Sequence, residues 1–190
     1  MSRNLFIALA LVAAALSACA TGGPPPAAAP TGGLVTVAVM PLEDFGEETG
    51  GVFQVQGLLE QALAAKGYAT ADQASLKRLL LRERVRRSGS VSRQLAALIH
   101  QELGAPYVLL GAVTQYRTGL DPCVSVVARL LEAASGRIVW MGAASSTGAQ
   151  HETVLGLGRI NDPSRLSEVV VAELLSSLPP AGVAAAWVAP

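Results

Sequence analysis

The sequence has no excess of charge of either sign, and it is poor in cysteine. Lys and Arg together number 14, Asp and Glu together number 14, and two residues are Cys. Without a net positive charge there is no global basic field of the kind that nucleic-acid binding needs, so no nucleic acid is expected as a partner. Cys123 lies within an apolar, strand-like run, where a cysteine is usually a small buried hydrophobe rather than a reactive thiol.

The sequence also lacks complete catalytic, cofactor-binding and metal-binding motifs. His151 and Glu152 begin in the manner of a zinc-protease helix, but Leu155 stands at the position of the required second histidine. The run GLGRIN has Asn161 where a dinucleotide-binding loop needs its third glycine, and neither a G-x-S-x-G elbow nor a P-loop occurs. His100 lies on a predicted helix and is expected to be exposed or half-buried. We therefore expect a protein that is not an enzyme, with no catalytic residues, no cofactor and no metal.

Four carboxylates gather in one predicted loop, at Glu43, Asp44, Glu47 and Glu48. Carboxylates this close in sequence could pair for acid/base catalysis or hold a divalent cation such as calcium. No histidine or asparagine accompanies them nearby, so a solvated loop over residues 43–48 is the favoured interpretation.

The chain begins with a predicted targeting segment. Arg3 precedes the apolar run LFIALALVAAA, which is too short to span a bilayer as a mature helix but suits the middle region of a secretory signal. The residues Leu-Ser-Ala-Cys at 16–19 resemble the bacterial lipobox, in which the signal is cleaved before a cysteine that carries lipid. We therefore predict a lipoprotein signal peptide at 1–18 and a lipidated Cys19, which would leave Cys123 with no partner for a disulfide. The alternatives are an ordinary secretory signal and an uncleaved anchor.

The anchor and the linker behind it set the expected location. Ala20 follows the cysteine at the position where many lipoproteins of the inner membrane have Asp, so the resemblance favours the outer membrane, with the domain facing the periplasm. Residues 19–33 form a Gly/Pro/Ala linker that cannot bury a core. This linker reaches about 45 Å when extended and averages nearer to about 20 Å as a flexible coil. The domain is therefore expected to stay close to its membrane.

The rest of the chain predicts one α/β domain at 34–178. Apolar periodicity, Pro and Gly stops, and Ser or Asp caps predict the order strand, helix, short strand, two helices, three strands, helix. The predicted strands are 34–42, 68–71, 106–117, 123–133 and 136–146, and the predicted helices are 52–66, 72 or 75 to 87, 92–103 and 163–178. Turn-like links join the last three strands, which indicates an antiparallel meander. We therefore expect a mixed sheet flanked by helices, followed by a proline-bounded apolar tail at 179–190.

Three stretches of the chain resemble the curli assembly and transport lipoprotein family (CsgG-like). They are the opening VAVMPLEDF and the longer runs LKRLLLRERVRRSGSVSRQLAALIHQELGAPYVLLGAVTQY and VVARLLEAASGRIVWMGAAS. The same pattern occurs in related penicillin-binding-protein activators and flagellar accessory lipoproteins. The resemblance covers about residues 35–178 and implies a mixed α/β domain that acts by binding other proteins. Pore-forming members carry two inserted hairpins, whose strands need about 9 to 11 alternating residues each. The sequence has no spare segment of that kind, so a member that does not form pores is expected.

The most basic segment is the predicted helix that ends at Arg87. Its basic residues, opposed by Glu83 alone, are Lys77, Arg78, Arg82, Arg84, Arg86 and Arg87. A basic helix on a tethered domain could contact anionic lipid headgroups or an acidic partner surface, so the candidate partner-binding residues are Arg82, Arg84, Arg86 and Arg87. The alternative is a solvated face whose arginine stems cover apolar surface around Leu76, Leu79 and Leu80.

Together these features predict a non-enzymatic lipoprotein of the outer membrane that binds or helps to assemble an envelope complex, for secretion or for a surface structure. Its partners would be the membrane, through the N-terminal lipid, an envelope protein, and copies of itself through the sheet edge or the basic helix. The alternative is an activator of a peptidoglycan synthase, against which the short linker counts, because such an activator must reach far across the periplasm. An envelope enzyme with an unrecognised site ranks third.

Overall fold

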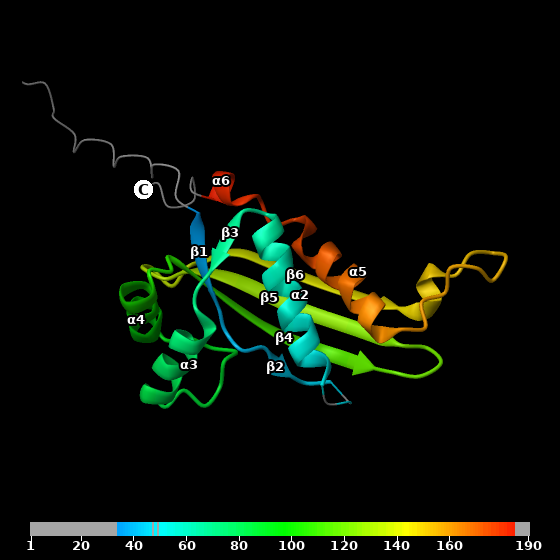
Figure 1. Ribbon diagram of the computed structural model, residues 1–190, viewed down its shortest axis with the longest axis horizontal. Helices are drawn as coiled ribbons and strands as arrows, with labels where there is room; N and C mark the ends of the chain where they lie inside the picture. The colour runs from blue at the N-terminus through cyan, green and yellow to red at the C-terminus, as the bar shows by residue number, and fades with distance from the viewer. Residues whose placement is uncertain (1–33, 47, 49, 185–190) are drawn as a thin grey trace, which may run out of the picture. The chain divides into compact units, whose positions relative to one another are not determined.

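A six-stranded sheet with helices on both faces organises the chain (Figure 1). The computed structural model describes residues 34–46, 48 and 50–184, so the predicted signal peptide, Cys19 and the linker lie outside the described residues. The strands are β1 (Val35–Val39), β2 (Glu43–Asp44), β3 (Tyr68–Thr70), β4 (Tyr107–Arg117), β5 (Cys123–Glu132) and β6 (Ile138–Thr147). The helices are α2 (Gly51–Ala65), α3 (Gln73–Arg82), α4 (Arg93–Leu103), the short 3-10 helix η1 (Gly148–His151), α5 (Pro163–Ser176) and α6 (Ala181–Ala184).

The sheet is mixed, as predicted. Its strand order is β3-β1-β4-β5-β6, and β2 pairs separately with β4. β1 runs parallel to both β3 and β4, whereas β4, β5 and β6 are antiparallel to one another. The predicted fold class, with its antiparallel meander of three strands, is therefore confirmed.

The alternation of side chains along the inner strands divides the core between two faces. Val37 and Val39 of β1 belong to a core cluster with α2 and α5, whereas Ala38 and Met40 belong to a second cluster with α3 and α4. Successive residues of a strand point to opposite faces, which explains why the four consecutive residues Val37–Met40 are all apolar and buried. Figure 1 shows α2 and α5 lying together across the sheet, and α3 and α4 grouped apart from them at the β1 end.

The segment Pro163–Val183, which includes α5, is one described helical stretch that is long and apolar enough to cross a membrane by length and composition. Its apolar side chains are already packed in the domain, because Leu166, Val170 and Leu174 are buried in the core cluster with the sheet and α2. We therefore interpret α5 as a core helix. Pro163 occupies its first turn, where a proline costs no hydrogen bond.

One strand and one helix boundary differ from the prediction: Glu43 and Asp44, predicted as part of a solvated loop, form β2 against β4, because β4 is long enough to pair beyond the end of β1. α3 ends at Arg82 rather than at Arg87, because the backbone NH of Val85 donates to the Leu80 carbonyl and Arg84 takes a positive φ of 52°. Val85 is then free to pack against the second core cluster, which a continued helix would not allow. The tail after residue 178 begins in contact with the domain, since Ala181 is buried and its NH donates to the Lys66 carbonyl.

Candidate functional site

The face of the sheet that α3 and α4 cover is left open over the later part of the meander. We call this surface the open sheet face; its residues are Ala112, Thr114, Ser125, Val127, Arg129, Met141, Ala143 and Ser145. Strand register places them side by side, with Val127 paired to both Ala112 and Ala143, and Arg129 paired to Met141. Val127 is 38% exposed and Met141 is 71% exposed.

The composition of the open sheet face is unusual for a surface in contact with water. Antiparallel sheets that face solvent on one side normally carry polar and charged residues there. Among these eight residues Arg129 is the one charged residue, Thr114 and Ser125 satisfy each other through a 2.8 Å hydrogen bond between their hydroxyls, and the rest are small or apolar. Register places Gln115 and Arg117 on the same side of the sheet, at the end of β4. Depletion of charge is what distinguishes the buried centre of a protein interface from ordinary surface.

The edge of the open sheet face is the strand β6. It runs for ten residues, Ile138–Thr147, without a charged residue or a proline, and among the described strands it pairs only with β5. Natural proteins usually protect such an edge with Lys, Pro, bulges or short length, because its free NH and carbonyl groups can pair with another strand. The opposite edge, β3, has only three residues.

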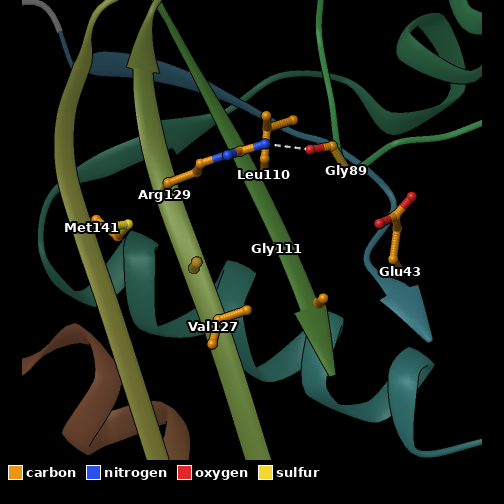
Figure 2. Close-up of a pocket in the computed structure, with 9 residues that line it drawn as sticks. Glu43, Gly89, Leu110, Gly111, Val127, Arg129 and Met141 are labelled. Carbon is orange, nitrogen blue, oxygen red and sulfur yellow. Dashed lines mark hydrogen bonds between the residues drawn. The ribbon is translucent and has the colours of Figure 1, made fainter. Parts of the chain in front are cut away.

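A hollow of about 260 Å³ lies where the open sheet face meets the loop between α3 and α4 (Figure 2). Apolar and small residues of β4 and β5 form its floor, and Met141 lines it from β6. The guanidinium of Arg129 crosses the hollow and donates to the carbonyl oxygen of Gly89, which fixes the loop to the sheet. Glu43 lines the same hollow from β2.

Gly89, on the loop between α3 and α4, lies directly against the Glu43 side chain of β2. A Cβ atom at residue 89 would lie 2.1 Å from the Glu43 carboxylate oxygen Oε2, so any side chain there would displace the carboxylate. The backbone of Gly89 therefore separates one acidic and one basic side chain at the rim of the hollow. Neither Glu43 nor Arg129 stood out from the sequence as part of one site, since they are far apart along the chain.

The four candidate partner-binding arginines are divided by the end of α3. Arg82 makes a two-pronged contact with Glu102 of α4, at 3.1 Å for its Nη1–Oε2 pair, and it also contacts Glu83. Hydrogen bonds from Arg82 lower the pKa of Glu102, and the same contacts raise the pKa of Arg82. Arg82 thus joins α3 to α4.

Arg84, Arg86 and Arg87 lie on the loop after α3 rather than on a helix, which corrects the predicted basic helix. All three are exposed, and none of their side chains makes a hydrogen bond or an ion pair with a residue that the structure describes. They therefore stay candidates for partner binding, on the loop that borders the hollow.

The acidic segment does not bring its carboxylates together. Glu43 and Asp44 form β2, and Asp44 accepts from the backbone NH of Gly46 at 3.0 Å. Glu48 instead accepts from the NH and the hydroxyl of Thr118, and these bonds hold the pKa of Glu48 below its usual value. Glu47 lies outside the described residues, and the described part of the chain has no group of three residues able to hold a metal ion.

The remaining residues weighed for chemistry have structural contacts. His151 lies on η1, and its Nε2 is 2.9 Å from the Ser146 hydroxyl. Glu152 pairs with Arg159. His100 is exposed on α4, as expected, and Cys123 is buried, with its Sγ 3.3 Å from Oε1 of Gln115.

Comparison with known proteins relates the chain to solved structures, whereas no protein-family model and no curated protein matches it. A PelC dodecamer from Paraburkholderia phytofirmans is similar at 22% identity and a TM-score of 0.55, over 77% of this chain and 89% of that one. Lipoprotein GNA1162 from Neisseria meningitidis is similar at 23% identity and a TM-score of 0.54, over 76% of this chain and 99% of that one. The LpoB C-terminal domain from Salmonella enterica reaches a TM-score of 0.47 at 19% identity, over 61% of this chain and 86% of that one.

At these identities the PelC and GNA1162 structures show that the fold is shared. The class of protein that the chain defines is therefore a mixed α/β domain of the kind found in PelC and GNA1162, and its resemblance to the CsgG-like family stays a prediction.

Proposed function

We propose that the protein is a lipid-anchored component of the bacterial envelope, and that its domain acts by binding proteins rather than by catalysis. The observation that carries the proposal is the open sheet face with its long, uncharged edge β6, whose one irregularity of register lies near its start, at Val139. This surface offers exposed apolar side chains, small neighbours and free strand-pairing groups, but no complete set of catalytic side chains among the described residues.

A second copy of the chain is the first partner that we assign to the open sheet face. The similar PelC structure is a dodecamer, which supports self-association as a property of proteins with this fold. The small residues Ala112, Ala143 and Ser145 would let another backbone approach closely, and Met141 and Val127 would supply apolar contact area. Self-association through an edge strand also needs no specific side-chain chemistry, because backbone groups provide the bonds.

The proposal also includes attachment of the domain to a membrane through an N-terminal lipid. Lipid on Cys19 would place the domain on the periplasmic side of the outer membrane, and the similarity to GNA1162, a lipoprotein of the same fold, supports an anchor of this kind. The exposed arginines Arg84, Arg86 and Arg87, next to the hollow, would then face an acidic surface of an envelope partner. We propose that such a partner belongs to an assembly for secretion or for a surface structure.

Activation of a peptidoglycan synthase is the second candidate. It rests on the sequence resemblance to penicillin-binding-protein activators, since the LpoB domain matches below a TM-score of 0.5. Crosslinking in intact envelopes separates the two functions. Recovery of a peptidoglycan synthase would favour the activator, and recovery of the protein itself together with a secretion or assembly component would favour the first proposal.

The self-association part is tested with two matched charge substitutions. Met141→Asp places a carboxylate on the open sheet face, and Leu81→Asp places one on α3 at a similar exposure, 69% against 71%. We expect the unaltered protein to form an oligomer in sedimentation velocity, Met141→Asp to dissociate at least about tenfold more readily, and Leu81→Asp to behave as unaltered protein. Equal effects of the two substitutions, or a monomeric unaltered protein, would contradict the proposal.

The anchor is tested separately. Mass spectrometry of the mature protein should find acyl chains on Cys19, and Cys19→Ser should release the protein from membranes. An unmodified Cys19 would leave the open sheet face untouched as a binding surface but would remove the assignment to a lipoprotein.

A further inference from the structure

Four aliphatic side chains project from the end of the molecule at which β4 stops. Leu120, in the turn between β4 and β5, is 92% exposed. On the loop between η1 and α5, Val154 is fully exposed, Leu155 is 83% exposed and Leu157 is 66% exposed. We call these four residues the apolar tip. Figure 1 shows that both loops extend from this same end, away from α3 and α4.

The loop that carries three of these residues is internally bonded rather than loose. The NH of Thr153 donates to the Leu157 carbonyl at 2.7 Å, and the NH of Gly156 donates to the Thr153 carbonyl at 2.9 Å. The NH of Leu157 donates to the Thr153 hydroxyl. Gly156, with a φ of 74°, allows the tight turn. The segment 153–158 thus satisfies several of its own backbone groups and contains no charged residue.

The charges next to the apolar tip are paired at its base. Nη1 of Arg159 lies 3.1 Å from Oε2 of Glu152, and its Nη2 donates to the Leu120 carbonyl at 2.9 Å and lies 3.4 Å from Oδ1 of Asp121. This one guanidinium joins the bases of the two loops. It also pairs with one carboxylate from each loop, Asp121 and Glu152, which reduces the charge that would otherwise oppose burial of the tip.

We propose that the apolar tip inserts into the apolar layer of a lipid membrane. A membrane fits the tip better than a protein partner does, because the side chains project outward and do not line a hollow. All four side chains of the tip are aliphatic, so none of them has a polar group that would need a hydrogen-bond partner in hydrocarbon. Hydrocarbon demands that backbone polar groups be bonded within the inserted segment, and the hydrogen bonds of this loop meet that demand in part.

The same membrane can hold the lipid anchor and receive the apolar tip. β1 runs parallel to β4 with Val37 opposite Tyr107, so the chain enters the domain at the start of β4 and the tip lies at its end. β1 begins two residues before this register and β4 has eleven residues, so the path from Val35 to the end of β4 is about 43 Å. A linker that can extend to about 45 Å is long enough to bridge that distance. The inference does not depend on what binds the open sheet face.

Quenching of a fluorescent label in vesicles tests the inference. Full-length mature protein with its native N-terminus, carrying Leu157→Cys labelled with an environment-sensitive dye, is reconstituted into phosphatidylethanolamine/phosphatidylglycerol vesicles. Leu81→Cys, labelled in the same way, is the matched control at 69% exposure on α3. Cys123 is buried and should take no label in the folded protein. We expect lipid-borne quenchers to act on the label at position 157 and aqueous iodide to act on the label at position 81.

A second variant separates insertion by the tip from attraction by the dye. Adding Leu155→Asp to the labelled Leu157→Cys protein should weaken quenching by lipid at least about tenfold, since burying one leucine is worth roughly one factor of ten or more. Adding Phe53→Asp, at an equally exposed residue of α2, should leave quenching unchanged. Insertion should also change little with salt or with the phosphatidylglycerol fraction, because the neighbouring charges are paired.

Either of two results would overturn the inference. If iodide quenches the label at position 157 as strongly as the label at position 81, the apolar tip lies in water. Protection of position 157 from both iodide and lipid quenchers would show that a second copy of the protein covers the tip. Circular dichroism of each variant confirms that the domain is folded before either result is read.

Discussion

Replacement of Tyr68 by Phe should lower stability at neutral pH and leave it about unchanged at alkaline pH. Tyr68 is 2% exposed in the core between β1, α2 and α5, and its hydroxyl donates to the Pro179 carbonyl at 2.7 Å. This bond fastens the end of α5 to the edge of the sheet, beside a second bond from Nζ of Lys66 to the Leu178 carbonyl. Loss of one such hydrogen bond costs about 1 kcal/mol. At pH 8, Tyr68→Phe should therefore be less stable than the unaltered protein by about that amount.

Alkaline pH should remove this advantage. Burial raises the pKa of Tyr68 to about 12, with a smaller contribution from Tyr107, against about 10 in the unfolded chain. Because the folded pKa is the higher one, the stabilisation is complete below pH 10 and is lost as the pH rises from 10 towards 12. At pH 11 this linkage amounts to at most about 1.4 kcal/mol, which is close to the contribution of about 1 kcal/mol from the hydrogen bond. Tyr68→Phe has no such loss, so the two proteins should be about equally stable at pH 11.

The assay is urea unfolding of both proteins at pH 8 and pH 11. The difference in unfolding free energy between the two proteins at pH 8 is compared with the same difference at pH 11. Tyr107 and Tyr116, whose pKa values are also raised by burial, are present in both proteins and cancel. A stability gap that is the same at both pH values would refute the reasoning. A gap at pH 8 close to zero would show that the bond to Pro179 contributes nothing.

Two further predictions concern glycines and the loop beside the hollow. Gly51→Ala should cost about 1 to 3 kcal/mol, because the new Cβ would lie 2.2 Å from the buried Tyr116 ring, whereas Gly57→Ala in the same helix meets nothing within 4 Å and should be neutral or stabilise by about 0.5 to 1 kcal/mol. Thermal unfolding of the pair measures this, and similar effects of the two changes would contradict it. Arg129→Ala should release the loop 83–92 from the sheet, since the bond to Gly89 is lost, and hydrogen exchange of that loop should become faster while exchange in β4 stays unchanged. If hydrogen exchange in the loop 83–92 is unaltered, the packing of Val85 and Val91 is enough to keep the loop in place without Arg129.

Helix starts were predictable because their signals are local. Ser92 accepts from the NH of Leu95 at 3.2 Å and caps α4, as predicted. Asp72 accepts from the NH of Ser75 at 2.8 Å, so of the two predicted candidates, Asp72 and Ser75, it is Asp72 that caps α3. Gly104, with a φ of 63°, ends α4 as predicted. In each case, neighbouring residues alone decide the conformation.

The end of α3 was not predictable in the same way. Its basic residues are compatible with further helical turns, and the predicted helix therefore ran on to Arg87. The chain leaves the helix at Arg82 because Val85 and Val91 gain more by packing on the second core cluster. This preference depends on α4 and β4, which are distant from Val85 in the sequence.

The sequence by itself determined the order of the longer elements, the mixed sheet and the antiparallel meander, because apolar periodicity, caps and turn residues act within a few residues of one another. It did not predict the short elements β2, η1 and α6. Only the tertiary structure decided which face of the meander stays open, which arginines are paired, and where the leucines of the apolar tip lie. A strand with alternating side chains shows that it has two faces, but whether a helix covers the second face depends on the length and direction of segments elsewhere in the chain. The open sheet face and the apolar tip are therefore products of packing, which local sequence patterns do not encode.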